Sequence, residues 1–113
     1  TSKGQSIKSI EPESLGQIIS ADTAKTMKDF MRSVVNEGTG VNASIEGVEV
    51  CGKTGTADHQ AEGKDAPPHS WFIGFAPYDN PQVAVAVIVE DGGQGGKAAA
   101  IIASEVMRVA LKK

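Results

Sequence analysis

The feature of the sequence that most constrains the fold is a run of strand-forming residues bounded by turn residues. Residues 82–90 (Gln-Val-Ala-Val-Ala-Val-Ile-Val-Glu) are rich in β-branched side chains, which favour strands. Residues 70–76 (Ser-Trp-Phe-Ile-Gly-Phe-Ala) form a second such run, and Tyr78-Asp79-Asn80-Pro81 separates the two. A short polar turn between two strand patterns predicts an antiparallel hairpin. A β-sheet is therefore expected at the centre of the fold.

A third strand is expected before this hairpin, over residues 48–54 (Val-Glu-Val-Cys-Gly-Lys-Thr). Its first residues alternate between apolar and polar, as in a half-buried strand. Residues 58–69 are polar and contain glycine and proline, which predicts a loop. The three strands are expected to form an antiparallel meander within residues 47–91.

Two helices are expected to flank the sheet. Ser20 is a favourable N-cap for a helix over residues 20–37, and Gly38 is the expected left-handed residue after its end. A glycine-rich segment at residues 92–96 leads into a second helix over residues 96–112. The apolar residues at helical spacing, expected to face the core, are Ala24, Met27, Phe30, Met31, Val34 and Val35 in the first helix, and Ala99, Ile102, Ala103, Val106, Val109 and Ala110 in the second.

The order of elements predicts the α+β class: helix, three-stranded antiparallel meander, C-terminal helix. Residues 1–19 are expected to be an extended lead-in that lies over another element. The length of 113 residues fits one small domain or one piece of a larger domain. A formal charge of −3 without a basic stripe argues against nucleic acid or an anionic membrane as a partner. The single cysteine, Cys51, excludes an internal disulfide.

Three short patterns resemble ligand sites but lack the context that such sites need. Residues 47–54 match the phosphate-loop pattern G-x-x-x-x-G-K-[ST], yet a strand is expected where that pattern needs a loop, and no helix follows. Residues 93–98 resemble a dinucleotide fingerprint, but the chain ends before a second strand. Cys51, His59 and His69 do not have the spacing of a metal site. We therefore expect neither a cofactor nor a metal.

The residues Lys53-Thr54-Gly55-Thr56 carry the strongest functional signal. The lysine supplies an ammonium group, and the two threonines supply hydroxyls that can bind a carboxylate. Gly55 has no side chain, so an extended peptide can lie close to the strand. A backbone N–H at the end of an edge strand can face a developing oxyanion. We expect a binding site for the anionic end of a substrate here.

Four blocks around this motif closely resemble the C-terminal part of penicillin-binding protein transpeptidase domains, of the class B, monofunctional kind involved in elongation or division. The blocks are residues 31–40, 50–57, 69–77 and 83–87, and the resemblance runs from about residue 12 to the C-terminus. It implies that residues 1–113 are the C-terminal fragment of a larger domain with a serine β-lactamase-like fold.

The resemblance also implies an activity. This family cross-links peptidoglycan stem peptides through a serine acyl-enzyme and binds β-lactams, which mimic D-Ala-D-Ala. It uses the motifs S-x-x-K, S-x-N and K-T-G, of which only the third occurs here. The nucleophile is therefore expected outside this chain, which by itself should be inactive. The parent protein is expected at the extracytoplasmic face of a bacterial membrane, held by an anchor that is not in this chain.

By position in the family motif, Lys53 and Thr56 are the expected catalytic residues. Lys53 would shape the electrostatics around the serine of the second motif. The hydroxyls of Thr54 and Thr56, beside Gly55, would bind the terminal carboxylate of the substrate. The backbone N–H of Thr56 would form half of the oxyanion hole. Neither Trp71 nor Cys51 has an expected catalytic role: the first should pack and the second should be a small buried side chain.

Three alternatives stay open within and beyond this family. They are a D,D-carboxypeptidase, a serine β-lactamase, and a β-lactam-sensing or non-catalytic relative. The expected partners are the stem peptide, β-lactams and the remainder of the transpeptidase domain. The edge of the strand at residues 82–90, with Val83, Val85, Val87 and Val89, is expected to promote self-association of the chain.

Overall fold

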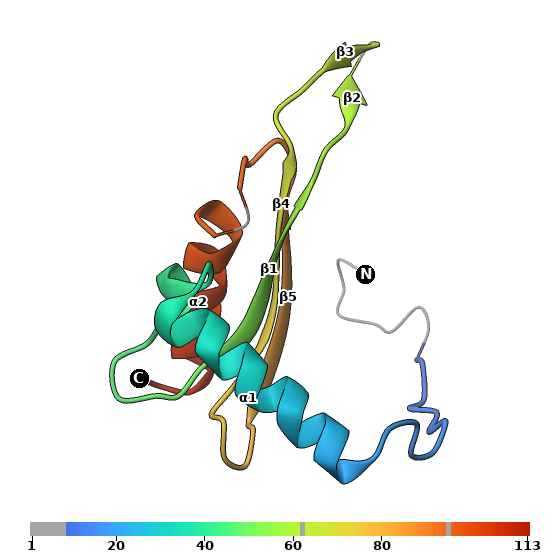
Figure 1. The fold of residues 1–113 in the computed structure, drawn as a ribbon, viewed down its shortest axis with the longest axis vertical. Coiled ribbons are helices and arrows are strands. Elements are labelled where there is room, and N and C mark those ends of the chain that lie inside the picture. The colour runs from blue at the N-terminus through green and yellow to red at the C-terminus, as the bar shows by residue number, and fades with distance from the viewer. Residues whose placement is uncertain (1–8, 62, 95) are drawn as a thin grey trace.

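The structure, a computed structural model, describes residues 9–61, 63–94 and 96–113. Its elements are α1 (Ala21–Glu37), η1 (Val41–Ala43), β1 (Cys51–Ala57), β2 (Gln60–Ala61), β3 (Lys64–Asp65), β4 (His69–Ala76), β5 (Val83–Val89) and α2 (Ala98–Ala110). The main sheet has the order β1-β4-β5, with both pairs antiparallel. The expected α+β order of helix, antiparallel meander and helix is confirmed (Figure 1).

The first strand begins and ends later than expected. Val48 belongs to a tight turn instead: it forms an isolated bridge with Ile45, and Gly47 between them has a φ of 78°. The strand then starts at Cys51 and continues through Ala57. All of residues 53–56 consequently lie inside β1, at one edge of the sheet as far as the described residues show.

The segment expected to be a plain loop contains a second, small hairpin. Strands β2 and β3 pair through Gln60 with Asp65 and Ala61 with Lys64. Gly63, at a φ of 74°, allows the tight reversal between them. This hairpin projects beyond the end of the main sheet that also holds the C-terminal end of β1 (Figure 1).

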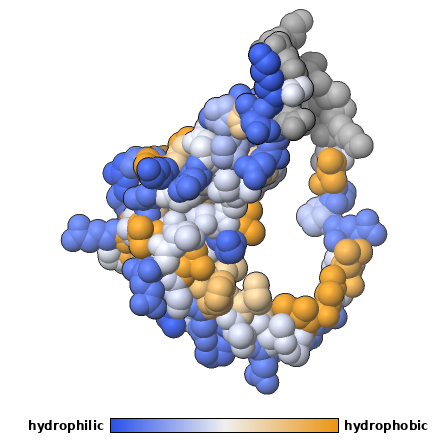
Figure 2. Space-filling view, turned by 45° about the horizontal axis from the view of Figure 1, so that its top comes forward, coloured by the Kyte–Doolittle hydropathy of each residue, from blue (hydrophilic) through white to orange (hydrophobic). Residues whose placement is uncertain are grey.

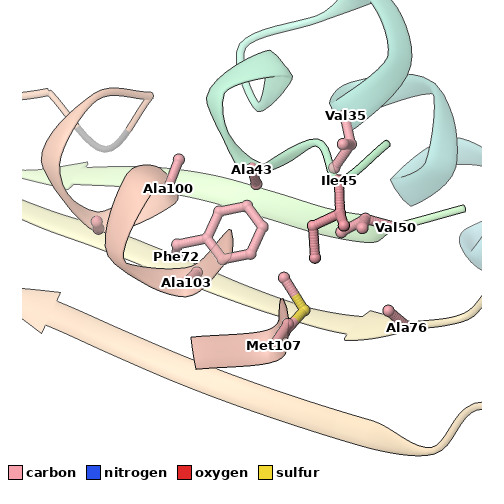
Figure 3. Close-up of a cluster of buried hydrophobic side chains, with 10 residues drawn as sticks. Val35, Ala43, Ile45, Val50, Phe72, Ala76, Ala100, Ala103 and Met107 are labelled. Carbon is pink, nitrogen blue, oxygen red and sulfur yellow. The ribbon is translucent and has the colours of Figure 1, made fainter. Parts of the chain in front are cut away.

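The core lies between α2 and one face of the sheet. Four residues of α2 are fully buried there: Ala99, Ala100, Ala103 and Met107. Figure 3 shows the ring of Phe72 close to Ala43, Ala100 and Ala103. Small alanines let the helix approach the sheet closely, which leaves room for the large side chains of Phe72 and Met107.

The expected buried stripe of α2 was therefore partly wrong. Ala99 and Ala103 are buried, but Ile102, Val106 and Val109 are 43%, 48% and 73% exposed. The helix turns three alanines and Met107, rather than its β-branched residues, toward the sheet. Helix α2 is also shorter than the expected 96–112, since it ends at Ala110.

The valines of β5 do not lie on an exposed face. Val83, Val85, Val87 and Val89 are partly buried against the core cluster, while the residues between them are exposed. Side chains alternate between the two faces of a strand, so these valines point toward α2. What β5 exposes is its backbone edge, because no described strand pairs with its outer side.

Helix α1 begins as expected but packs differently. Ser20 is its N-cap, and the Ser20 hydroxyl accepts a hydrogen bond from the Thr23 N–H at 3.1 Å. Gly38 follows its last residue but has a φ of −111°, so the expected left-handed conformation is wrong. Val35 is the one buried residue of the helix. Its C-terminal end thus reaches the core from the β1 side of the sheet.

The first turns of α1 lie beside the sheet face opposite α2. There Met27 and Phe30, expected in the core, are 53% and 59% exposed. They line a shallow hollow with Ile73, whose side chain points away from Phe72 and the core. The apolar stripe of α1 therefore faces an open surface rather than the α2 layer.

The lead-in does not cover another element over its described part. Ile10, Leu15 and Ile18 are each more than three-quarters exposed, and Figure 2 shows hydrophobic side chains along a segment that stands apart from the main body. Residues 1–8 of the expected lead-in lie outside the described residues. Among the described residues, no helix is long and apolar enough to cross a membrane.

Candidate functional site

The motif residues alternate along the edge strand β1. Lys53 and Gly55 point to the open face of the sheet, whereas Thr54 and Thr56 point to the face that α2 covers. Lys53 and Thr56 are exposed, and Thr54 is only 9% exposed. One short strand segment thus presents an ammonium group and a hydroxyl to solvent on opposite faces.

The Lys53 side chain bends back along its own strand. Its Nζ donates a hydrogen bond to the carbonyl oxygen of Thr54 at 2.6 Å. The aliphatic part of the side chain lines the shallow hollow that Met27, Phe30, Met31 and Ile73 also form. The ammonium group is thereby held against the backbone of the motif strand.

A second threonine orients the hydroxyl of Thr54. Thr39 lies in the loop after α1, and its Oγ1 is 2.7 Å from Oγ1 of Thr54. The backbone N–H groups of Gly38 and Gly40 both donate to the carbonyl oxygen of Val34, at 3.1 and 3.0 Å, which ties this loop to the helix end. Sequence reasoning assigned no role to Thr39. The one sequence feature that could have pointed to Thr39 is its place between two glycines, directly after the helix.

Ser70 supports the strand from the other side. It is the register partner of Thr56 on β4 and is fully buried. Its hydroxyl donates to the carbonyl oxygen of Gln94 at 3.1 Å and accepts from the N–H of Ala99 at 3.1 Å. Lys97, the N-cap residue of α2, makes no side-chain cap. Ser70 therefore holds the start of α2 to the sheet beside Thr56, a role that sequence reasoning missed.

Gly55 faces Trp71 across the strand pair. A Cβ at Gly55 would lie 3.3 Å from the Cβ of Trp71, so the two strands are close at this point. Trp71 is 40% exposed, because it lies on the open face of the sheet. Among the described residues, Trp71 packs against Gly55 of β1, as expected of a packing residue. Its outer surface stays open.

A family model decides what these residues belong to. The model described as "Penicillin binding protein transpeptidase domain" matches residues 3–108 of the chain. The chain belongs to the penicillin-binding protein transpeptidase family. The resemblance of the four sequence blocks is thereby confirmed.

Curated members of this family align with nearly the whole chain. A "Peptidoglycan D,D-transpeptidase PbpA" from Mycolicibacterium smegmatis is 39% identical over 112 residues, which are 95% of this chain and 23% of that protein. "Stage V sporulation protein D" from Bacillus subtilis is 41% identical over 113 residues, which are 95% of this chain and 18% of that protein. The chain thus spans about a quarter or less of the length of these relatives.

Solved transpeptidase structures share the fold. The D,D-transpeptidase domain of a peptidoglycan glycosyltransferase from Eggerthella lenta superposes with a TM-score of 0.77 at 38% identity, over 98% of this chain and 25% of that chain. Penicillin-binding protein A from M. tuberculosis, in a ceftriaxone acyl-enzyme complex, gives a TM-score of 0.73 at 38% identity, over 82% of this chain and 22% of that chain.

The phosphate-loop pattern in this transpeptidase-family chain has a packing explanation. Strand β1 runs without interruption from Cys51 through the motif, so neither the loop nor the following helix of a phosphate site is present. A Cβ at Gly52 would lie 2.2 Å from Cζ of Phe72. Gly52 is glycine because the core phenylalanine occupies that space.

Neither of the two other patterns forms a site as a whole: Cys51 begins β1, whereas His59 and His69 lie at the other end of that strand. Gly93, at a φ of 82°, lies in the connection from β5 to α2, and Gly95 lies outside the described residues. Cys51 is fully buried, as expected. Burial raises the pKa of its thiol, which disfavours the thiolate and therefore any nucleophilic role.

Proposed function

We propose that this chain forms the substrate-carboxylate and oxyanion-binding wall of a serine D,D-transpeptidase that cross-links peptidoglycan. The observation that carries the proposal is the Lys53–Thr56 segment on an edge strand, with the hydroxyl of Thr54 held by Thr39. Relatives of this chain that are named peptidoglycan D,D-transpeptidases support the same reaction.

Each motif residue has a separate task in this proposal. The Thr39 hydroxyl contact leaves the Thr54 hydroxyl able to donate to a carboxylate while it accepts from Thr39. The exposed Thr56 donates to the same carboxylate from its hydroxyl and to the developing oxyanion from its backbone N–H. Gly55 lets the peptide lie against β1. The Lys53 ammonium stabilises negative charge beside the acylated serine.

The acylating serine and its base lie outside residues 1–113 in this proposal, since the chain contains no S-x-x-K and no S-x-N motif. The chain then acts as the C-terminal part of a larger transpeptidase domain and is inactive alone. Its substrates are stem peptides ending in D-Ala-D-Ala, and β-lactams acylate the same serine. Peptidoglycan lies outside the cytoplasmic membrane, so the parent protein works at that face of the membrane.

Acylation by a fluorescent penicillin tests the proposal. The transpeptidase domain that contains this chain should be labelled, and the 113-residue chain alone should not. Thr56→Val should lower the second-order rate of acylation by about tenfold or more, because a hydrogen bond to a charged group contributes about 1.5–3 kcal/mol. Thr26→Val is the matched control, since its hydroxyl bonds only to the Asp22 carbonyl oxygen within α1.

Two results would contradict the proposal. Labelling of the isolated chain would show that it carries its own nucleophile. Acylation of the Thr56→Val domain at the rate of the Thr26→Val domain would show that Thr56 does not bind the ligand carboxylate. A domain that binds penicillin without acylation would instead favour a sensing or non-catalytic relative.

A further inference from the structure

Three side chains with metal-binding atoms meet at one end of the main sheet. His59 lies two residues after the end of β1, His69 is the first residue of β4, and Asp91 lies two residues after the end of β5. Because β4 runs antiparallel to both neighbours, these three chain positions fall at the same end of the sheet. The spacing along the sequence is too wide to suggest a site, and only the fold brings the residues together.

The distances within this cluster are short. His59 Nε2 lies 2.5 Å from Asp91 Oδ1, and His69 Nδ1 lies 4.0 Å from the same oxygen. One ligand atom from each residue falls within 4.8 Å of the others. The two histidine side chains are only 24% and 27% exposed, so they are fixed near the surface rather than extended into solvent.

The backbone around the cluster is held in place. Asp91 adopts a φ of 52°, unusual for a residue with a side chain, and its N–H donates to His69 Nδ1 at 3.0 Å. The next loop is fixed by the Gly93 N–H, which donates to the Pro68 carbonyl oxygen at 2.9 Å. These two backbone hydrogen bonds hold the Asp91 carboxylate beside the histidines.

We propose that His59, His69 and Asp91 bind a divalent transition-metal ion, and that Zn²⁺ is the ion they fit best. Two imidazoles and one carboxylate are one of the protein ligand sets found in three-ligand zinc sites. Mg²⁺ and Ca²⁺ prefer oxygen ligands, so two nitrogen donors disfavour them. This proposal does not depend on the proposed transpeptidase activity.

The nitrogen–oxygen separations in the cluster lie on either side of the ligand–ligand distance in a zinc site. Zn–N and Zn–O bonds of about 2.0–2.1 Å in a tetrahedron place two ligand atoms about 3.3 Å apart. The separations of 2.5 and 4.0 Å lie on either side of that value. The imidazole rings are stacked, with centroids 3.9 Å apart and planes at 14°. Coordination through Nδ1 therefore requires the His69 ring to rotate about its broad χ2 torsion, which breaks the hydrogen bond that Nδ1 accepts from the Asp91 N–H.

The metal ion would replace the proton that His59 Nε2 shares with its oxygen partners when no ion is bound. His59 Nε2 lies within hydrogen-bond distance of both the Asp91 carboxylate and the Pro67 carbonyl oxygen, the latter at 2.8 Å. Coordination replaces the proton shared with Asp91, so binding releases it to solvent. The ion would then tie the root of the β2–β3 hairpin to the β5–α2 connection, beside the Ala57–His69 register pair.

Metal titration of the untagged full chain tests this site directly. Calorimetry with Zn²⁺ should show one ion per chain, Co²⁺ should give a visible absorption band, and Mg²⁺ should not compete. His59→Gln and His69→Gln should each lower the Zn²⁺ affinity at least tenfold. Asp91→Asn should do the same while keeping the backbone, because asparagine tolerates a positive φ.

Matched controls separate the site from adventitious binding. Asp65→Asn and Glu90→Gln remove nearby carboxylates that lie outside the cluster, and Cys51→Ala removes the thiol. All three should leave the affinity unchanged, and far-UV circular dichroism should confirm that every variant is folded. The proposal is overturned by any of three results: no stoichiometric Zn²⁺ binding, wild-type affinity in the His59→Gln and His69→Gln variants, or loss of binding in Cys51→Ala.

Discussion

The hydroxyl of Thr54, inside the edge strand, lies 2.7 Å from the hydroxyl of Thr39, in the loop that ends α1. This contact joins two segments that are separated in the sequence by 15 residues, which include the Ile45–Val48 bridge. Thr54 is only 9% exposed, so it has little access to water as an alternative partner. The hydrogen bond therefore holds the two side chains together, whichever hydroxyl donates.

Thr39→Val should destabilise the chain by about 1–2 kcal/mol, since it leaves a buried hydroxyl without its partner. Thr54→Val should cost a similar amount, and the double variant should cost less than the sum. Urea denaturation of the four proteins in this cycle measures the coupling, expected at about 0.5–1.5 kcal/mol. Strict additivity of the two substitutions would show that the two hydroxyls do not interact.

Gly52→Ala should destabilise the chain more than most single substitutions on β1. The added Cβ would lie 2.2 Å from Cζ of the buried Phe72, and overpacking of this kind costs about 1–3 kcal/mol. Gly55→Ala is the matched comparison on the same strand, because its Cβ would come no closer than 3.3 Å to Trp71. Thermal unfolding should give a clearly lower midpoint for Gly52→Ala than for Gly55→Ala. Equal midpoints would remove the packing explanation for Gly52.

The sequence predicted the element order and the motif strand because those signals are local. The alternating valines, the Tyr78–Pro81 turn and the Ser20 cap each act over a few residues. The antiparallel hairpin and the start of α1 accordingly lie where they were expected.

The packing directions were harder to predict because they depend on contacts between distant segments. The pattern of α2 contains more apolar positions than one face can bury. The alanines are buried because their small side chains let the helix pack closely against the Phe72 ring. For α1, propensity and spacing do not reveal which sheet face a helix will follow. The same reason applies to Thr39, Ser70 and the two histidines, whose partners lie 15 or more residues away.

A polar cluster ties α1 to the turn between β4 and β5. The Tyr78 hydroxyl donates a hydrogen bond to Asp29, and Lys25 Nζ contacts the other oxygen of the same carboxylate at 2.8 Å. Arg32 lies 4.0 Å from the centroid of the Tyr78 ring. The hydrogen bond from Lys25, and then that from Tyr78, lowers the pKa of Asp29. The hydrogen bond to Asp29 raises the pKa of Tyr78.

Tyr78→Phe should therefore lower stability in a pH-dependent way. A lowered carboxyl pKa stabilises the fold above the usual value of 3.8, and this is lost as the pH falls through the folded pKa. A raised phenol pKa stabilises the fold below 10.0, and this is lost as the pH rises through the folded pKa. The difference in urea midpoint between the wild type and Tyr78→Phe should thus be constant from about pH 5 to 9 and shrink outside that range.

Substitution at an exposed position of helix α1 provides the control for this profile. Thr26→Val lies on the same helix and has no ionisable partner. Its effect on the urea midpoint should not vary between pH 3 and 11. A Tyr78→Phe difference that is equally flat would show that the contribution of the Tyr78–Asp29 contact does not depend on the ionisation of either group.

The outer edge of β5 should promote association of the isolated chain. Its N–H and C=O groups have no strand partner among the described residues, and an unpaired edge is a template for another strand. Ala86 is exposed, on the face opposite the α2 layer, so Ala86→Lys introduces a charge at this edge without disturbing the core. Light scattering should detect dimers or larger species of the wild-type chain that Ala86→Lys reduces.

Ala110→Lys controls for the added charge, because Ala110 is exposed at the end of α2, far along the chain from the β5 edge. It should leave the association unchanged. The edge is the cause only if the two lysine variants differ, since a general gain in solubility would affect both equally. A wild-type chain that stays monomeric at high concentration, with slow amide exchange along β5, would mean that the free edge is protected by other means.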